Sequence, residues 1–216
     1  MKLVKTGIAG LDEFLQGGIP PRVLLLLGLP GSGNEVFARQ IAYERAKQNA
    51  VTYFTVSTAP EFVKDDMASY GWDTAQLEET GVWKFINLTK ATSIVNTIAK
   101  EVKEGRCVVV DSLSELLINR KVKDVVGLLT TLAVENREGK EFHLMLLTEG
   151  MQNKKVETTM EHFAEGVIVF DTNWTTDSTN RDIFIKKMRG TLIPSRKLPY
   201  KIGKKGFIIE TAIRIT

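Results

Sequence analysis

A glycine-rich stretch, "GLPGSGNE" (residues 28–35), holds the residue types best suited to binding a phosphate group. It follows an apolar run and precedes a helical pattern. In that setting, backbone N–H groups of a glycine loop converge on phosphate at the positive end of a helix. The phosphate-loop pattern is G-x-x-x-x-G-K-[S/T]. The corresponding residues here are Gly28, Pro30, Gly31, Ser32, Gly33, Asn34 and Glu35.

The last two positions depart from the pattern, and they are the ones that handle charge. Lysine normally reaches the β- and γ-phosphates, and the Ser/Thr hydroxyl holds Mg²⁺. Asn34 has no charge and Glu35 brings a negative one. These replacements predict ATP binding weakened roughly 10²- to 10⁴-fold. They also fit a second interpretation, in which Asn34 or Glu35 satisfies N–H groups at the start of the helix.

The elements around this loop alternate between strands and helices. Continuous short apolar runs are typical of strands buried on both faces of a parallel sheet. Apolar residues at helical spacing lie between them, over 92–104 and 122–137. This alternation predicts an α/β fold with a mostly parallel central sheet and helices on both faces. The expected strands are 23–28, 51–56, 83–88, 107–112, 142–148 and 167–171.

The pattern changes near residue 181, after which strands follow one another without a helix. We expect strands over 182–188, 197–202 and 206–211, forming antiparallel strands at one edge of the sheet. No repeat or linker interrupts the chain. We therefore expect a single domain over 1–216, with 181–216 as its C-terminal β extension.

Composition indicates a globular protein of the cytoplasm. The chain has 216 residues, 43% of them hydrophobic and 25% charged. A single cysteine excludes a disulfide framework and favours a reducing compartment. The longest apolar run, 23–27, is far shorter than the ~20 residues of a membrane span, and no signal peptide is expected.

Positive charge is concentrated near the C-terminus. Between Arg181 and Lys205 there are nine Lys or Arg and one acid, Asp182, a local charge of +8 in a chain whose net charge is +3. Such a segment suits a phosphate, nucleic-acid or acidic-partner surface. The alternative is a set of solvated strands that use lysine to block edge pairing.

Several motifs occur in order along nearly the whole chain. They are "TGIAGLDEFLQGGIPPRVLLLLGLPGSG" (6–33), "ASYGWD" (68–73), "CVVVDSLSELL" (107–117), "LLTEG" (146–150), "FAEGVIVF" (163–170) and "KKMRGT" (186–191). Together they resemble KaiC-like domains of the RecA-type ATPase superfamily. The resemblance implies a RecA-like P-loop fold with ATP at the subunit boundaries of a ring or filament.

The resemblance also implies roles for individual residues. Asp111, followed by Ser112, stands at the Walker B position, where a carboxylate orients Mg²⁺. A Walker B aspartate without a metal could instead bond loop N–H groups. The strand that reaches a neighbour's nucleotide is matched by Lys187, Arg189 and Thr191, which strand alternation would place on one face.

One further position departs from the family's pattern. The family follows its second strand with a pair of glutamates, one of them the general base, and here Ser57 and Thr58 stand at those positions. Glu61 is nearby, but the T-x-x-E spacing from Thr58 predicts a capping box at a helix start.

The chain lacks the loop lysine, the Ser/Thr hydroxyl that holds Mg²⁺ and the paired glutamates. We therefore expect a protein that is not an enzyme. We expect a pseudo-ATPase that acts as a regulatory or scaffold subunit, associating with itself, with a KaiC- or RecA-like paralogue or with another partner. No metal site and no cofactor are expected, with weak binding of ATP or Mg²⁺ left open. One alternative is a divergent ATPase that recruits Lys154 or Lys155 as its lysine. Another is a nucleic-acid binder that uses 181–205.

Overall fold

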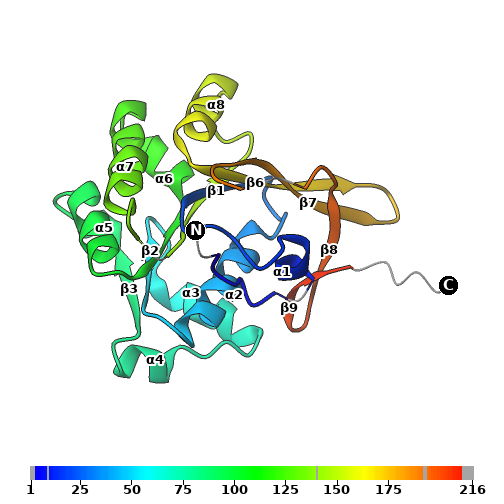
Figure 1. The fold of residues 1–216 in the computed structure, drawn as a ribbon, viewed down its shortest axis with the longest axis horizontal. Helices are drawn as coiled ribbons and strands as arrows, with labels where there is room; N and C mark the ends of the chain where they lie inside the picture. The colour runs from blue at the N-terminus through cyan, green and yellow to red at the C-terminus, as the bar shows by residue number, and fades with distance from the viewer. Residues whose placement is uncertain (1–2, 9, 140, 192–193, 211–216) are drawn as a thin grey trace.

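Among the described residues, 3–8, 10–139, 141–191 and 194–210, the computed structural model contains one nine-stranded sheet (Figure 1). The strand order is β3-β2-β4-β5-β1-β6-β7-β8-β9. Strands from β3 to β6 in this order are parallel, and β7, β8 and β9 are antiparallel. The strands are β1 (Val23–Gly28), β2 (Val51–Thr55), β3 (Trp83–Asn87), β4 (Cys107–Asp111), β5 (His143–Thr148), β6 (Gly166–Trp174), β7 (Thr179–Met188), β8 (Leu198–Gly203) and β9 (Gly206–Ile209).

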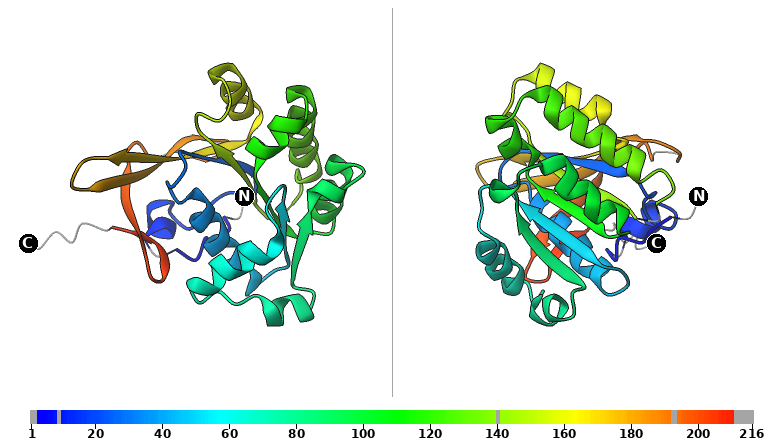
Figure 2. Two further views of the ribbon diagram at one scale, coloured as in Figure 1. Left: turned by 180° about the vertical axis from the view of Figure 1, so that it is seen from behind. Right: turned by 90° about the vertical axis from the view of Figure 1, so that its left-hand side faces the viewer.

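Helices cover both faces of the sheet, as the two views of Figure 2 show. One face packs against the first four helices and the other against the last four. The helices are α1 (Leu11–Phe14), α2 (Asn34–Ala46), α3 (Pro60–Ser69), α4 (Ala75–Glu79), α5 (Ile94–Lys103), α6 (Leu113–Asn119), α7 (Val122–Glu135) and α8 (Lys154–Phe163), with a 3₁₀ turn at Leu88–Lys90. The predicted α/β fold, with antiparallel strands at its C-terminal edge, is confirmed.

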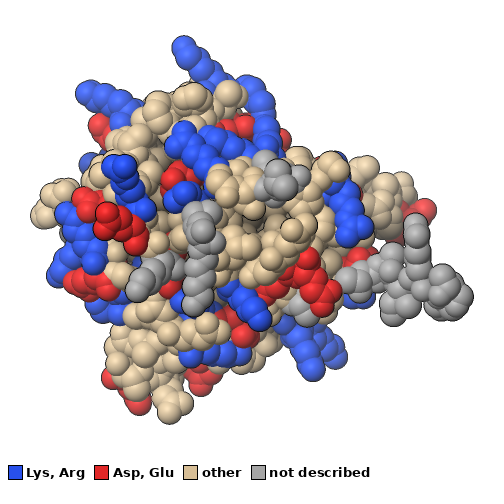
Figure 3. Space-filling view, viewed as in Figure 1, with Lys and Arg blue, Asp and Glu red and all other residues tan. Residues whose placement is uncertain are grey.

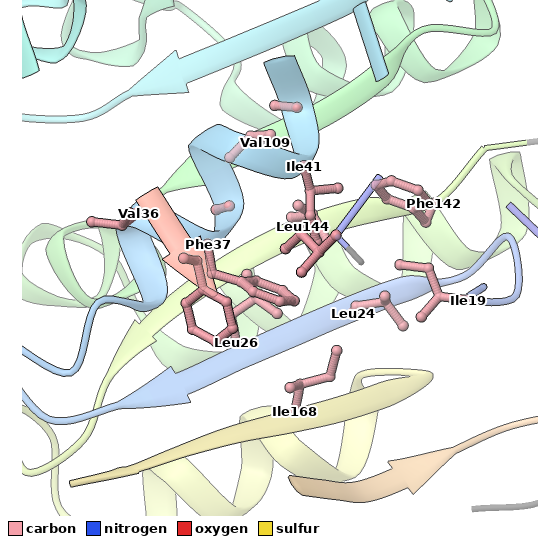
Figure 4. Packing of buried hydrophobic residues seen from close by; sticks show 14 of the residues in the cluster. Ile19, Leu24, Leu26, Val36, Phe37, Ile41, Val109, Phe142, Leu144 and Ile168 are labelled. Atoms are coloured by element: carbon pink, nitrogen blue, oxygen red, sulfur yellow. The ribbon is translucent and has the colours of Figure 1, made fainter. Parts of the chain in front are cut away.

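The core beneath α2 fixes the position of the glycine-rich loop. Phe37 and Ile41 of α2 are fully buried and lie over Leu24, Leu26 and Leu144 of the sheet (Figure 4). Fully burying such a side chain stabilises the fold by about 1.5–3 kcal/mol. The start of α2, and hence the loop before it, is therefore held rigidly against β1.

An aromatic cluster attaches the C-terminal strands to the same helix. The Phe37 ring lies 4.9 Å from Phe170 of β6 and 5.0 Å from Phe207 of β9, measured between ring centroids. Tyr200 of β8 stacks on Phe207 at 4.3 Å. Gln40 of α2 also accepts a hydrogen bond from the Phe207 N–H at 2.7 Å. The β8–β9 hairpin is therefore packed beside the first turns of α2.

Most expected strands agree with the structure to within one or two residues, and β6 and β7 are the exceptions. Strand β6 continues to Trp174 and β7 begins at Thr179, because their hairpin extends beyond the core, as Figure 1 shows. The last expected strand, 206–211, is present as Gly206–Ile209, and residue 211 lies outside the described residues.

Candidate functional site

The glycine-rich loop joins the carboxyl end of β1 to α2. Two of its glycines have left-handed backbone angles, with φ +79° at Gly31 and +85° at Gly33. A Cβ atom at Gly33 would also lie 2.1 Å from Ile202 Cδ1, so a side chain at this position would force Ile202 to move. The loop therefore has the strand–turn–helix arrangement that aims backbone N–H groups at a phosphate.

Asn34 is the first residue of α2 and is buried against β1. Its Nδ2 donates to the Leu26 carbonyl oxygen at 3.3 Å, and its Oδ1 accepts from the Glu35 N–H at 3.0 Å. The prediction that a side chain at 34 or 35 satisfies an N–H at the helix start is thus confirmed for Asn34. Both polar atoms of this amide are used inside the chain, so Asn34 anchors the loop to the strand.

Glu35 lies partly exposed in the first turn of α2, where the helix dipole favours a carboxylate. No described residue donates a hydrogen bond to this carboxylate. Burial raises the pKa of the neighbouring Tyr200 to about 12; the adjacent Thr172 side chain and the charge of Arg181 oppose that shift, and the charge of Glu35 adds to it. The charges of Glu35 and Arg181 therefore both influence the electrostatic potential around the loop.

Two residues of the C-terminal strands donate hydrogen bonds to the loop, and the motifs did not indicate either one. The Tyr200 hydroxyl donates to the Ser32 carbonyl oxygen at 2.6 Å. Arg181 Nη2 donates to the Gly31 carbonyl oxygen at 3.5 Å. The only sequence signal for Arg181 was its place at the start of the basic segment.

Three buried polar atoms of these segments have no hydrogen-bond partner among the described residues: Ser32 Oγ, Thr172 Oγ1 and Arg181 Nε. Ser32 belongs to the loop itself and is fully buried. Buried polar groups are nearly always paired in folded proteins, because an unpaired one costs about 1–3 kcal/mol. The unpaired atoms are therefore a feature that a ligand at the loop could explain.

Asp111 ends β4, two strands away from β1 in the sheet. Because the carboxyl ends of parallel strands lie at one edge, Asp111 and the loop share that edge. The Tyr53 hydroxyl donates to Asp111 Oδ2 at 2.7 Å, and Arg39 Nη2 lies 3.4 Å from the same oxygen. The interpretation that Asp111 bonds loop N–H groups does not hold, since side chains of β2 and α2 take that place.

Arg39 is the centre of this polar group. Its side chain is about nine-tenths buried, and it also contacts Asp66 at 3.1 Å and the Tyr53 hydroxyl at 3.3 Å. Burial by itself lowers the pKa of Arg39, but Tyr53 and Asp111 outweigh that effect and raise it. Burial also raises the pKa of Tyr53 well above its usual value, so Tyr53 stays protonated and donates. Sequence periodicity gave no sign of this ionic group.

The residues at the expected glutamate positions have a carboxylate beside them from another helix. Glu115 of α6 accepts a hydrogen bond from the Ser57 N–H at 2.7 Å. Ser112 is the N-cap of α6, and its hydroxyl accepts from the Glu115 N–H at 3.4 Å. The spacing Ser112-x-x-Glu115, typical of a capping box, was the signal that could have drawn attention to Glu115.

The capping box predicted from Thr58 to Glu61 is wrong. Helix α3 begins at Pro60 with Ala59 as its N-cap, and no side chain caps it. Proline at the first helical position has no N–H to satisfy and fixes the backbone angle for the helix start. The side chains of Thr58 and Glu61 are therefore not needed to cap the start of α3.

The basic residues of β7 occupy different positions from those that strand alternation predicts. Lys187 donates to the carbonyl oxygens of Glu161, His162 and Ala164, at 2.6–3.1 Å, and so caps the end of α8. Strand β7 ends at Met188, so Arg189 and Thr191 lie beyond it, both exposed. A contact of these residues with a neighbour's nucleotide stays a prediction.

Lys154 and Lys155, the candidate replacements for the loop lysine, begin α8. The ammonium of Lys154 lies 3.7 Å from a carboxylate oxygen of Glu157, and both lysines line an open depression on the outer side of the helix. No contact of either lysine with the glycine-rich loop is found among the described residues.

Three of the nine basic side chains between residues 181 and 205 form ion pairs within the chain. Lys186 pairs with Glu161, Lys197 with Asp171 and Lys201 with Glu210. On the face shown in Figure 3, basic side chains have acidic ones among them. This pairing favours the interpretation of solvated strands over a continuous nucleic-acid surface.

Two features are absent from the described residues: a cluster of metal ligands and a membrane-spanning helix. No group of three or more His, Cys, Asp or Glu is placed to hold a metal ion. No helix within the described ranges has the length and apolar character needed to cross a membrane.

Comparison with known proteins agrees with the geometry. The model of the family "ATPase: KaiC" matches residues 4–212. A UPF0273 protein of Aeropyrum pernix is 30% identical over 242 residues, covering 98% of this chain and 96% of its own length, and one of Pyrococcus horikoshii is 28% identical, covering 95% and 93%. The crystal structure of a KaiC-like protein from Pyrococcus horikoshii OT3 is similar in fold, with a TM-score of 0.83 at 24% identity, covering 97% of this chain and 99% of that one.

These matches correct the expectation that the chain is not an enzyme. That expectation rested on the residues at 34, 35, 57 and 58, whereas the family match extends over nearly the whole chain and the family is one of ATPases. The chain belongs to the KaiC family of ATPases.

Proposed function

We propose that this chain binds a nucleoside triphosphate at residues 28–35 and hydrolyses it. The observation that carries the proposal is the loop itself, a strand–glycine turn–helix unit in which the buried Ser32 hydroxyl has no partner within the described residues. A phosphate oxygen would accept hydrogen bonds from that hydroxyl and from the backbone N–H groups at the start of α2. Binding should be weak, because Asn34 supplies no charge.

The loop would receive the phosphate groups of the nucleotide, and two carboxylates near it would hold the metal ion. Asp111 accepts its hydrogen bonds at Oδ2, and no described residue bonds its Oδ1. Glu35 has a carboxylate without a described partner. Mg²⁺ prefers oxygen ligands of this kind, and when bound it supplies positive charge to the phosphate oxygens. Asp111 and Glu35 are therefore the residues that would hold it.

The proposal assigns the general base to Glu115. Its carboxylate is bonded to the Ser57 N–H, next to the positions where the KaiC-like pattern has its pair of glutamates. A carboxylate there would take the proton of an attacking water molecule. General-base catalysis of this kind typically accelerates a reaction 10²- to 10⁴-fold. Neither Ser57 nor Thr58 has a side chain basic enough for that role.

A thermal-shift and phosphate-release experiment tests the proposed function. Millimolar Mg-ATP should raise the melting temperature, since a ligand at 100 times its Kd stabilises by ~2.7 kcal/mol. Phosphate release should exceed background and fall in Asp111→Asn. The matched control is Asp177→Asn in the exposed β6–β7 turn, which should behave as wild type. No stabilisation and no phosphate release from the wild type would refute the proposal.

We also propose that copies of the chain associate, with Arg189 and Thr191 at the contact. Both are exposed just past the end of β7, where no described residue covers them. Light scattering coupled to size exclusion, with and without Mg-ATP, tests this. A monomer under both conditions, at concentrations where ATP binds, would exclude it.

A further inference from the structure

Strands β6, β7 and β8 present a row of three polar side chains toward the loop. Thr172 and Arg181 are direct partners across the antiparallel β6–β7 pair, so their side chains share one face. Asp182 pairs with Pro199, which places Tyr200 beside Arg181 on the next strand. The row lies just beyond the apolar residues of the same face, Phe170, Ile183 and Leu198.

Two members of this row contact carbonyl oxygens of the loop. The Tyr200 hydroxyl contacts the Ser32 carbonyl oxygen at 2.6 Å, and Arg181 Nη2 contacts that of Gly31 at 3.5 Å. The guanidinium therefore reaches the loop from a strand 150 residues away in the sequence. Among the described residues, no other Lys or Arg side chain donates a hydrogen bond to residues 28–33.

The polar atoms of the row are incompletely paired. Arg181 Nε, Thr172 Oγ1 and the adjacent Ser32 Oγ are buried and have no partner in the described structure. All three can donate a hydrogen bond. An oxyanion is the ligand class that accepts several such donors at once, and a guanidinium has the planar donor geometry suited to phosphate.

We propose that Arg181 supplies, from β7 of the same chain, the positive charge that a lysine at position 34 would otherwise give to the phosphate loop. The inference rests on the proposed function, because it assumes that the loop receives phosphate. With Ser32 and Thr172, Arg181 would bind the oxygens of a polyphosphate group, and it would offset the negative charge of Glu35. Lys187, Arg189 and Thr191 have no part in this role.

Isothermal titration with Mg-ATP and with inorganic tripolyphosphate tests the inference. Arg181→Gln should weaken binding of both ligands roughly 10- to 100-fold, the value expected for one charge-assisted hydrogen bond. Arg181→Lys should recover part of the affinity, and Glu35→Gln should strengthen tripolyphosphate binding. The matched control is Lys204→Gln, which removes one charge from the exposed β8–β9 turn and should leave both affinities unchanged. Melting curves without ligand verify that each variant is folded.

The outcomes separate the inference from the proposed function. ATP binding and hydrolysis that persist unchanged in Arg181→Gln would overturn the inference and leave the function intact. Tripolyphosphate binding that depends on Arg181, without ATP binding, would support the inference and refute the function. A wild type that binds neither ligand would overturn both. If Arg181→Gln does not fold, Arg181→Met takes its place, and wild-type affinity of that variant for tripolyphosphate would overturn the inference.

Discussion

Arg39 of α2 places its Nη2 3.4 Å from Oδ2 of Asp111, so the aspartate at the end of β4 has a cation fixed beside it. The guanidinium is part of the folded chain and is held by Tyr53 and Asp66 as well. Asp111 is therefore electrostatically balanced before any ligand arrives.

Removing Arg39 should destabilise the fold. Arg39→Met leaves Asp111 with Tyr53 as its one described side-chain donor, and breaking a mostly buried ion pair costs about 3–5 kcal/mol. Urea denaturation should show this loss, and Arg39→Met combined with Asp111→Asn should recover part of it. Arg137→Met, at an exposed position, is the control. Equal stability of Arg39→Met and wild type would contradict the role given to this ion pair.

Replacing the proposed base should slow hydrolysis without weakening nucleotide binding. Glu115→Gln keeps an acceptor for the Ser57 N–H but cannot take up a proton, so phosphate release should fall at least about 100-fold. Titration with Mg-ATP should give the wild-type affinity. Glu138→Gln, on an exposed turn, is the matched control. Wild-type turnover by Glu115→Gln would exclude Glu115 as the base.

Stability should fall in mild acid because of His143. Burial lowers the pKa of this histidine to about 3, from 6.5, and its Nδ1 accepts a hydrogen bond from the Val108 N–H at 3.3 Å. The neutral form in the fold contributes stability in full above pH 6.5, and this is lost as pH falls from 6.5 towards 3. Between pH 6.5 and 5 the loss should be roughly 2 kcal/mol.

Urea denaturation at pH 7.5 and 5.0 measures that loss. His143→Gln should lack this part of the pH dependence, although its stability at pH 7.5 can also change. His162→Gln, at an exposed position on α8, should keep the wild-type dependence. The assignment to His143 would be wrong if His143→Gln and wild type lost equal stability between the two pH values.

Tyr200 should hold the phosphate loop in place. Tyr200→Phe removes the hydrogen bond to the Ser32 carbonyl oxygen and leaves the ring stacked on Phe207, so it should cost about 1 kcal/mol. Hydrogen exchange should become faster in the loop and the first turn of α2. Tyr70→Phe, whose ring stacks on Trp72, is the control. Unchanged exchange at residues 29–36 would show that the loop is held by other contacts.

The sequence predicted the elements well where a local pattern determines them. Continuous apolar runs such as 107–111 identified the buried strands, and the glycine spacing identified the loop. The prediction failed where two local patterns competed. Pro60 sets the start of α3, so the T-x-x-E spacing from Thr58 to Glu61 forms no capping box. Strand alternation also predicted that Lys187, Arg189 and Thr191 share one face of a strand, but β7 ends at Met188.

The candidate site was harder to predict because its polar groups come from distant segments. Arg39 and Asp111 are 72 residues apart, and Arg181 and Gly31 are 150 apart. Such contacts depend on strand order and register, which periodicity does not encode. Inspection of positions 34, 35, 57 and 58 alone therefore indicated missing chemistry, whereas the fold brings Glu115 to Ser57 and Arg181 to the loop.

Equilibrium competition at the phosphate loop is the most direct test of the central claim that this chain binds a nucleotide there. A fluorescent ATP analogue is bound in the presence of Mg²⁺, and unlabelled ATP is then titrated up to millimolar concentration. The account predicts that ATP displaces the analogue from wild type, and that Gly33→Val, which fills the space against Ile202, abolishes binding while the far-UV spectrum stays native. Analogue binding that ATP does not displace, or that is equal in Gly33→Val, would contradict the claim.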